Sequence, residues 1–196
     1  MSTPLGLRAR PATALGVARP PLAGRVALVT AGWTELAVAV AARFREEGAE
    51  VVSISPSEAV VDEIAVATGA VAFVGDPASP RDVAAAVTLA RDRFGGLDAL
   101  IVTTSDRPDA VVLSTGVGMA SRELAERRGA VVVVSPFECC IAELTGECGR
   151  WGVRVNAVVP GSRCAAPRQV ASAIRFLASP EAAVVTGCVL RADAEL

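Results

Sequence analysis

The chain has 196 residues, of which 52% are hydrophobic, and its formal net charge is −2. This length is typical of one domain with a single core. The apolar residues come in short runs, and none reaches the roughly 18 uninterrupted residues of a membrane-spanning helix. The small negative charge offers no basic surplus to a nucleic acid. We therefore expect a protein that binds neither membranes nor nucleic acids.

Three residue types that often carry enzyme chemistry are missing. There is no His and no Tyr, and all 19 basic residues are Arg, so Lys is missing as well. This excludes Ser-His and Cys-His nucleophile pairs, His-ligated metals, lysine Schiff bases and a tyrosine acid. The five cysteines include no Cys-x-x-Cys pair, which argues against a zinc site. Their odd number is typical of reduced thiols, so we expect a cytoplasmic protein.

The first 22 residues differ in composition from the rest. They carry four prolines and three arginines but no acidic residue. They lack the apolar core of a secretory signal, although an organellar transit peptide has a similar composition. We favour a flexible or partner-bound arm over residues 1–22, followed by a single domain over residues 23–196.

Short apolar runs alternate with helical patterns along the domain. Runs without internal polar alternation are typical of strands buried on both faces of a parallel sheet. We therefore predict an α/β fold with a doubly wound, Rossmann-like parallel sheet. The expected strands are Arg25–Thr30, Val51–Ile54, Val71–Val74, Leu97–Val102, Ala130–Val134, Arg154–Val159 and Val189–Arg191. The expected helices are Glu35–Glu47 with Gly48 as C-cap, Ala59–Thr68, a helix capped by Ser79 that ends at Phe94, Val111–Arg127 and Arg168–Ala178.

Six segments, taken in order, resemble the short-chain dehydrogenase/reductase family. They are Leu22–Thr30 with Glu46–Val52, Asp76 after the third strand, Gly96–Ile101, Gly152–Gly161, Val170–Ser179 and Val185–Gly187. The match extends from Leu22 to Arg191. It implies a Rossmann domain descended from NAD(P)-dependent oxidoreductases.

The phosphate-binding turn departs from the family pattern. The family has Thr-Gly-x-x-x-Gly-x-Gly there, because glycines let backbone N–H groups approach the cofactor pyrophosphate at a helix N-terminus. Here Thr30 and Gly32 remain, but Ala31, Glu35 and Ala37 stand in place of the glycines. We expect the alanines to crowd the approach and the Glu35 carboxylate to take the place of the phosphates. If Glu35 is an ordinary first-turn acid, dinucleotide binding is expected to be equally weak.

Other cofactor contacts of the family also differ. Ser55-Pro56 ends the second strand where the family has an Asp or Arg for the adenosine ribose, and Val102–Ser105 replaces Asn-Asn-Ala-Gly. Ala165 aligns with the Thr that meets the nicotinamide. Asp76 resembles the adenine-contacting Asp, or is a helix-capping or turn residue. We expect Thr30, Gly32, Glu35 and Asp76 to be vestiges, with no cofactor or only weakly bound NAD(P).

The catalytic group of the family is missing. The family uses a Ser after the fifth strand and a Tyr-x-x-x-Lys on the next helix, where Lys lowers the pKa of the Tyr acid. Pro136 aligns with that Ser, and the stretch from Pro136 to Gly152 is too short for the long helix. Leu113 aligns with a catalytic Asn, and the closing helix follows Gly161 almost at once. We predict truncated active-site helices and no substrate lid.

Few groups remain near the former active site. Glu138, Cys139 and Cys140 are weak catalytic candidates, since a thiol there would depend on a helix start and on Arg150 or Arg163 for activation. The cysteines can equally be small buried residues. Two tryptophans, Trp33 and Trp151, are candidate anchors for a ligand or interface, or fillers of the core.

The truncation also predicts an uncovered sheet face. Val131–Val134 has apolar side chains on both faces, and the helix that should cover one face is reduced to a stub at Cys140–Cys148. Exposure would cost roughly 1.5–3 kcal/mol for each large side chain. We expect the arm, a second copy or another protein to cover this face, in a homo-oligomer or a hetero-oligomer with a full-length relative.

Together these features favour a catalytically inactive partner or scaffold subunit in a biosynthetic pathway. One alternative is an enzyme with repurposed, non-redox chemistry that uses Glu138, a cysteine or Arg163 in the same cleft. A residual NAD(P)-dependent reductase is another. A ligand-sensing regulator remains as a third, although no basic patch or helix-turn-helix pattern supports it.

Overall fold

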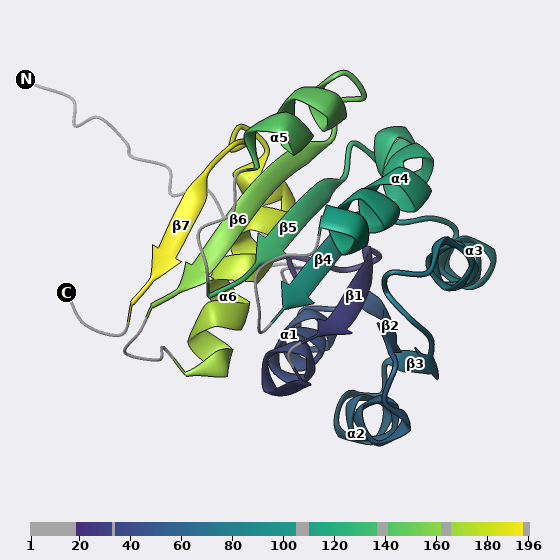
Figure 1. Ribbon diagram of the computed structural model, residues 1–196. Coiled ribbons are helices and arrows are strands. Elements are labelled where there is room, and N and C mark those ends of the chain that lie inside the picture. Colours follow the sequence, from purple (N-terminus) through teal and green to yellow (C-terminus); the bar gives the residue numbers. More distant parts are fainter. Residues whose placement is uncertain (1–18, 33, 105–109, 137–140, 162–165, 194–196) are drawn as a thin grey trace, which may run out of the picture.

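Seven parallel strands form one sheet at the centre of the molecule (Figure 1). The computed structural model describes residues 19–32, 34–104, 110–136, 141–161 and 166–193. The strand order is β3-β2-β1-β4-β5-β6-β7. The second and third strands are added on one side of β1 and the last four on its other side, so the strand order switches between β1 and β4. The predicted doubly wound, Rossmann-like sheet is confirmed. Its strands are β1 (Val26–Gly32), β2 (Glu50–Ser55), β3 (Val71–Val74), β4 (Ala99–Thr104), β5 (Ala130–Val134), β6 (Arg154–Pro160) and β7 (Val189–Ala192).

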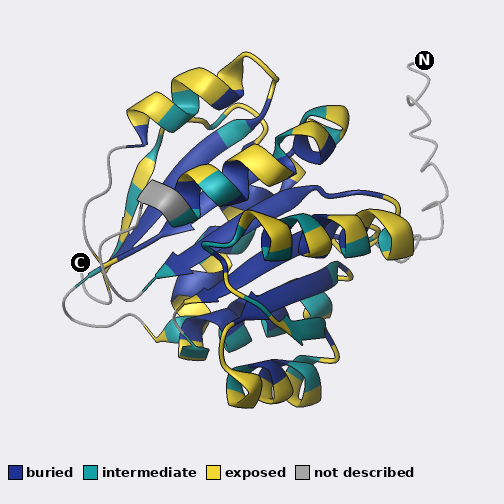
Figure 2. Cartoon of the chain, turned by 45° about the vertical axis from the view of Figure 1, so that its right-hand side comes forward, coloured by how far each residue is buried: buried dark blue, intermediate teal, exposed yellow. Residues whose placement is uncertain are grey.

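Helices cover both faces of this sheet, as the burial pattern in Figure 2 shows. Buried residues of α1, α2 and α6 pack on one face, and those of α3, α4 and α5 pack on the other. Ser79 caps α3 by accepting a hydrogen bond from the Asp82 N–H, as its sequence predicts. The helices are α1 (Thr34–Glu46), α2 (Glu58–Thr68), α3 (Pro80–Phe94), α4 (Ala110–Arg127), α5 (Ala142–Gly149) and α6 (Pro167–Ala178), followed by a 3-10 turn, Pro180–Ala182.

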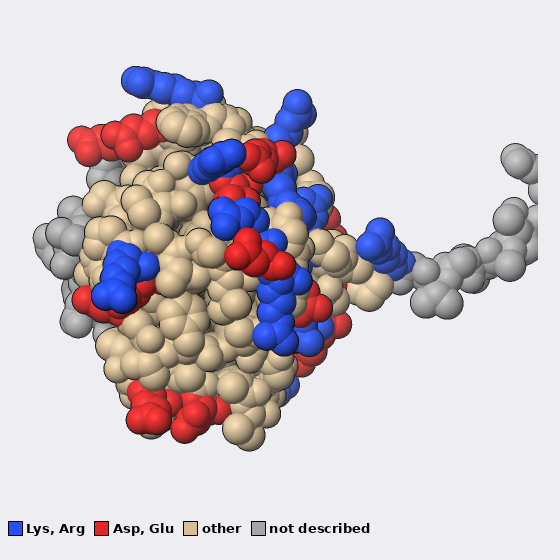
Figure 3. All heavy atoms as spheres, turned by 90° about the vertical axis from the view of Figure 1, so that its right-hand side faces the viewer, with Lys and Arg blue, Asp and Glu red and all other residues tan. Residues whose placement is uncertain are grey.

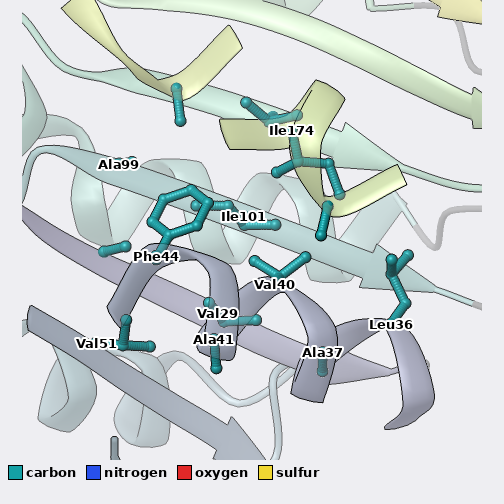
Figure 4. Packing of buried hydrophobic residues seen from close by; sticks show 14 of the residues in the cluster. Val29, Leu36, Ala37, Val40, Ala41, Phe44, Val51, Ala99, Ile101 and Ile174 are labelled. Atoms are coloured by element: carbon teal, nitrogen blue, oxygen red, sulfur yellow. The ribbon is translucent and has the colours of Figure 1, made fainter. Parts of the chain in front are cut away.

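The α1 helix is the centre of one half of the core (Figure 4). Leu36, Val40 and Phe44 recur at helical spacing, and all three are buried. They face β1 and β4 and lie against Ile174 of α6. This packing places the start of α1 at the carboxyl end of β1.

The folded part of the chain begins before residue 23. Leu22, which we placed at the end of the arm, is only 2% exposed. Its N–H donates to the Glu47 carbonyl at 3.1 Å, which ties the entry of β1 to the end of α1. The domain therefore includes the last residue that we assigned to the arm, and residues 1–18 lie outside the described part of the chain.

The expectation of an uncovered face on β5 is wrong. Val131 and Val133 are fully buried within the single chain. They pack against α4 and against Ile141 and Cys148, at the start and near the end of the short α5. The 18-residue α4 and the stub at α5 together suffice because β5 contributes only five residues. An apolar groove between these two helices remains at the surface.

Candidate functional site

A cleft of about 510 Å³ lies where β1, β2 and β4 end. In doubly wound sheets ligands bind at the carboxyl ends of the strands, where the strand order reverses. The cleft lies at that point, between the ends of β1 and β4. Every described residue that lines it is uncharged. They are Thr30, Ala31, Gly32, Thr34, Ser55, Pro56, Ser57, Val60, Pro77, Val102, Thr103, Thr104, Val112 and Leu113.

Two of the threonines are engaged in joining β1 to β4. The Thr103 hydroxyl donates to the Thr30 carbonyl at 2.6 Å, and the Thr103 N–H donates to the Thr30 hydroxyl at 3.3 Å. Both residues are nearly inaccessible to solvent. The Thr30 hydroxyl that we expected as a cofactor vestige therefore serves the sheet itself.

Gly32 has a packing role at the same crossing. A Cβ at this position would lie 2.3 Å from the Thr103 carbonyl oxygen, much closer than any allowed contact. The close approach of β4 thus requires glycine here. The presence of Gly32 does not depend on a bound phosphate.

The three residues that replace family glycines lie in different surroundings. Glu35 is exposed in the first turn of α1, outside the lining of the cleft. Ala37 is fully buried against the core, whereas Ala31 is buried at the cleft wall. Acidic residues in a first turn interact favourably with the helix dipole, which accounts for Glu35 without a ligand.

Asp76 lies on the turn that leads into α3. Its side chain accepts a hydrogen bond from the Ala78 N–H at 2.8 Å, and its own N–H donates to the Asp82 carboxylate at 3.0 Å. Pro77, but not Asp76, lines the cleft. These are the contacts of a turn residue, the second role that we considered for Asp76.

The former catalytic region is apolar where it is described. Leu113, at the position of the family's catalytic Asn, is buried and lines the cleft. Ser135 is buried, and its N–H donates to the Val158 carbonyl, whereas Pro136 is exposed. Glu138, Cys139, Cys140, Arg163 and Trp33 lie outside the described residues, as does Ala165.

A groove of about 340 Å³ separates α4 from α5. Its apolar lining includes Val117, Leu124, Leu144 and Val153, and Trp151 lies on its rim with 54% of its surface exposed. Cys148 is buried in the floor. Burial, and then the nearby Glu147 carboxylate, raise the pKa of this thiol. Cys148 is therefore a poor nucleophile.

Sequence reasoning missed a third cleft, at the amino edge of the sheet. Four arginines surround it, and all four lie at or next to the end of a strand or helix. Charged residues at the boundaries of buried strands were the available signal. On the face seen in Figure 3, in contrast, basic and acidic side chains are interleaved. Elsewhere in the described residues arginines are paired with acids, as in Arg91–Glu123 and Arg122–Glu126.

The described residues hold no group of three or more His, Cys, Asp or Glu side chains that could bind a metal ion. In the same residues, no helix has both the length and the apolar character needed to cross a membrane.

Comparison with known proteins establishes the family. A family model described as enoyl-(acyl carrier protein) reductase matches residues 32–145, which is more than half of the chain. The chain belongs to the short-chain dehydrogenase/reductase family. The matched region runs from the end of β1 into α5 and includes every described residue of the cleft lining except Thr30 and Ala31.

Individual relatives agree with this assignment. An uncharacterized oxidoreductase of Mycobacterium bovis is 26% identical over 235 aligned positions, which cover 86% of this chain and 95% of that protein. The 3-oxoacyl-(acyl-carrier-protein) reductase FabG of Vibrio cholerae is 25% identical over 242 positions, covering 88% of this chain and 97% of its own. Both alignments are longer than this chain of 196 residues, so they pass over positions that this chain lacks.

A solved structure with the same fold is the ribose-5-phosphate isomerase of Brucella melitensis. It has a TM-score of 0.75 and 24% sequence identity, with coverage of 90% of this chain and 93% of that one. At this identity the likeness concerns the fold alone.

Proposed function

We propose that this chain is a catalytically inactive family member that serves as a subunit of an oligomer in a biosynthetic pathway. The β5–β6 connection carries the argument. The family places its Tyr and Lys there, but here the only described helix between the two strands is the eight-residue α5. The whole chain contains neither Tyr nor Lys. The acid of carbonyl reduction and the group that tunes its pKa are both missing.

We infer from the cleft at the switch point that the chain binds NAD(P) weakly or not at all. The family holds the pyrophosphate with backbone N–H groups of a glycine-rich turn, but here Ala31 is buried at the cleft wall in place of one of those glycines. The Thr30 hydroxyl is already bonded to β4, and Ser55 accepts from the Ser57 N–H. The residues present do not fit the dinucleotide of the family.

The α4–α5 groove is the proposed site of association, and a second copy of the chain is the proposed occupant. Much of its wall is apolar, although Glu147 and Arg150 also line it, and the exposed Trp151 on its rim provides an aromatic anchor of the kind that dominates interface energies. Met119 of α4 is also exposed. A two-fold interface through this groove would bury Trp151 without a new fold element.

The first experiment combines cofactor titration with light scattering on the purified protein. We expect no saturable NADPH or NADH binding at micromolar concentrations, no reduction of carbonyl substrates, and a mass above that of one chain. Trp151→Ala should shift the mass toward the monomer, whereas Val66→Ala, at an exposed position on α2, should leave it unchanged. Micromolar cofactor binding with turnover, or a monomeric wild type, would contradict the proposal.

A second candidate function follows from the same uncharged cleft. About 510 Å³ lined by hydroxyl, proline and aliphatic groups matches a small neutral ligand better than a dinucleotide. Repurposed, non-redox chemistry would take place there. A crystal soak with a neutral fragment set tests it, and occupancy confined to other surfaces would count against it.

A further inference from the structure

The amino edge of the sheet carries a cleft of about 380 Å³ that is rich in arginine. Arg25 precedes β1, Arg154 opens β6, and Arg127 and Arg128 lie at the end of α4. Asp98, directly before β4, is the only acidic side chain in the described lining. This cleft is at the opposite end of the strands from the cleft at the switch point.

The single carboxylate of the cleft, that of Asp98, already accepts three hydrogen bonds from the protein. Asp98 accepts from Arg25 at 2.7 Å, from Arg127 at 3.2 Å and from the Val26 N–H at 2.9 Å. It is nearly buried, whereas the Arg25 and Arg127 side chains keep 40% and 31% of their surface exposed. One negative charge thus orients two guanidinium groups. Arg127 also donates to the Gly95 carbonyl, whereas the contact of Arg25 with Asp98 uses only its Nη1.

The other two arginines have no carboxylate partner among the described residues. Arg154 donates to the carbonyls of Leu177 and Ser179, at 2.7 and 3.1 Å. Arg128 is exposed, and its side chain makes no hydrogen bond or ion pair within the described part of the chain, although its backbone N–H donates to the Ala125 carbonyl at 3.2 Å. Burial, and then the charge of Arg25, lower the pKa of Arg154, as expected for a partly buried cation beside a second cation.

The charge balance of the cleft determines the class of ligand. Four guanidinium groups and one carboxylate leave three uncompensated positive charges. The carboxyl ends of α4 and α6 offset part of this, by roughly half an elementary charge each. A surplus of about two remains, and a phosphate monoester carries a charge of about −1.5 to −2 at neutral pH.

We propose that this cleft binds the phosphate group of a small phosphorylated molecule. Guanidinium groups match phosphate oxygens through paired N–H donors, which favours phosphate over a monovalent anion. Gly129 and Gly152 line the cleft without side chains, and Ala178 and Ala183 add small apolar walls for the rest of the molecule. The site is independent of the proposed inactivity and of the α4–α5 groove.

Calorimetric titration with inorganic phosphate and with phenyl phosphate at constant ionic strength tests the proposal. Arg128→Gln removes the one guanidinium that holds no other part of the protein, so folding should be unaffected. We expect saturable binding by the wild type and about tenfold weaker binding by the variant, which corresponds to one lost charge-assisted contact. Arg122→Gln is the matched control, because Arg122 is an exposed arginine of α4, the helix that ends next to Arg128, and lies outside the cleft.

Amide chemical shifts locate the bound ion. Phosphate should move the signals of Gly129 and Gly152, and not those of Thr30 and Ser57 at the opposite edge. Each of four results would overturn the proposal: a wild-type affinity weaker than about 1 mM, equal weakening in both variants, shifts confined to the opposite edge, or binding of an acidic peptide but not of phosphate.

Discussion

At the residue scale, the contact between Gly32 and Thr103 fixes how closely β1 and β4 approach. The side-chain hydroxyl of Thr103 bonds to β1, and the Thr103 carbonyl occupies the space where a Cβ of residue 32 would lie. A glycine in a nucleotide-binding turn invites a functional interpretation. Here backbone packing already requires it.

Gly32→Ala should therefore destabilise the fold even without any ligand. A Cβ at 2.3 Å from a backbone oxygen forces the strands apart, and overpacking of this kind costs about 1–3 kcal/mol. Urea denaturation measures the change. The matched control is Gly146→Ala in α5, where nothing lies within 4 Å and alanine should stabilise the helix by roughly 0.5–1 kcal/mol. Equal effects of the two substitutions would contradict this account of Gly32.

At the element scale, Arg175 joins α6 to the end of α1. Its guanidinium donates to Glu47 at 2.5 Å and to Glu181 at 2.6 Å, and Glu47 also accepts from Arg43. Burial by itself lowers the pKa of Arg175, but the bonds to the two glutamates raise it overall. The ion pairs thus lie at the edge of the most extensive helix–helix contact of the core and set how the two helices meet.

Arg175→Met should show how much the ion pairs of Arg175 contribute to stability, apart from the apolar packing of α6. The variant keeps most of the aliphatic stem but loses both ion pairs, and hydrogen bonds to charged groups contribute about 1.5–3 kcal/mol. Because Arg43 still pairs with Glu47, we expect a loss near the lower value, measured by thermal and urea unfolding. Arg168→Met, at an exposed position of the same helix, should change stability by less than about 0.5 kcal/mol. A neutral Arg175→Met would show that apolar packing alone fixes α6.

At the scale of the whole molecule, the domain from Leu22 onward forms a complete hydrophobic core. Both faces of the sheet are covered within one chain, including β5. Association, if it occurs through the α4–α5 groove, adds to a complete core and is not needed to build one. The partner proposal therefore depends on the surface of the groove and on Trp151.

Two truncations test where the domain begins. Removal of residues 1–18 should leave the unfolding free energy unchanged, because Leu22 and its bond to Glu47 remain. Removal of residues 1–24 takes away a side chain that is 2% exposed and should cost roughly 1.5–3 kcal/mol. Denaturation of the two truncated proteins beside the full chain measures both effects. If the shorter deletion is the more damaging one, the arm itself is part of the folded structure.

The strands and helices could be predicted from the sequence because their signals are local. Val131–Val134 is a strand in any context that buries it, and Ser79-Pro80 starts a helix through its own backbone geometry. The family could be predicted for the same reason, since six segments keep their order. The loss of the Tyr and Lys residues could also be predicted from the sequence, because composition alone shows that both residue types are missing.

The sequence by itself determined the doubly wound fold, the family and the missing reductase residues. Only the tertiary structure decided that Thr30 and Gly32 serve the β1–β4 contact, that α4 and α5 suffice to bury β5, and that four arginines converge at the amino edge. Covering a face and gathering charges both depend on distances between residues far apart in the chain. Arg25 and Arg154, for example, become neighbours of one cleft only when β1 and β6 take their places in the sheet.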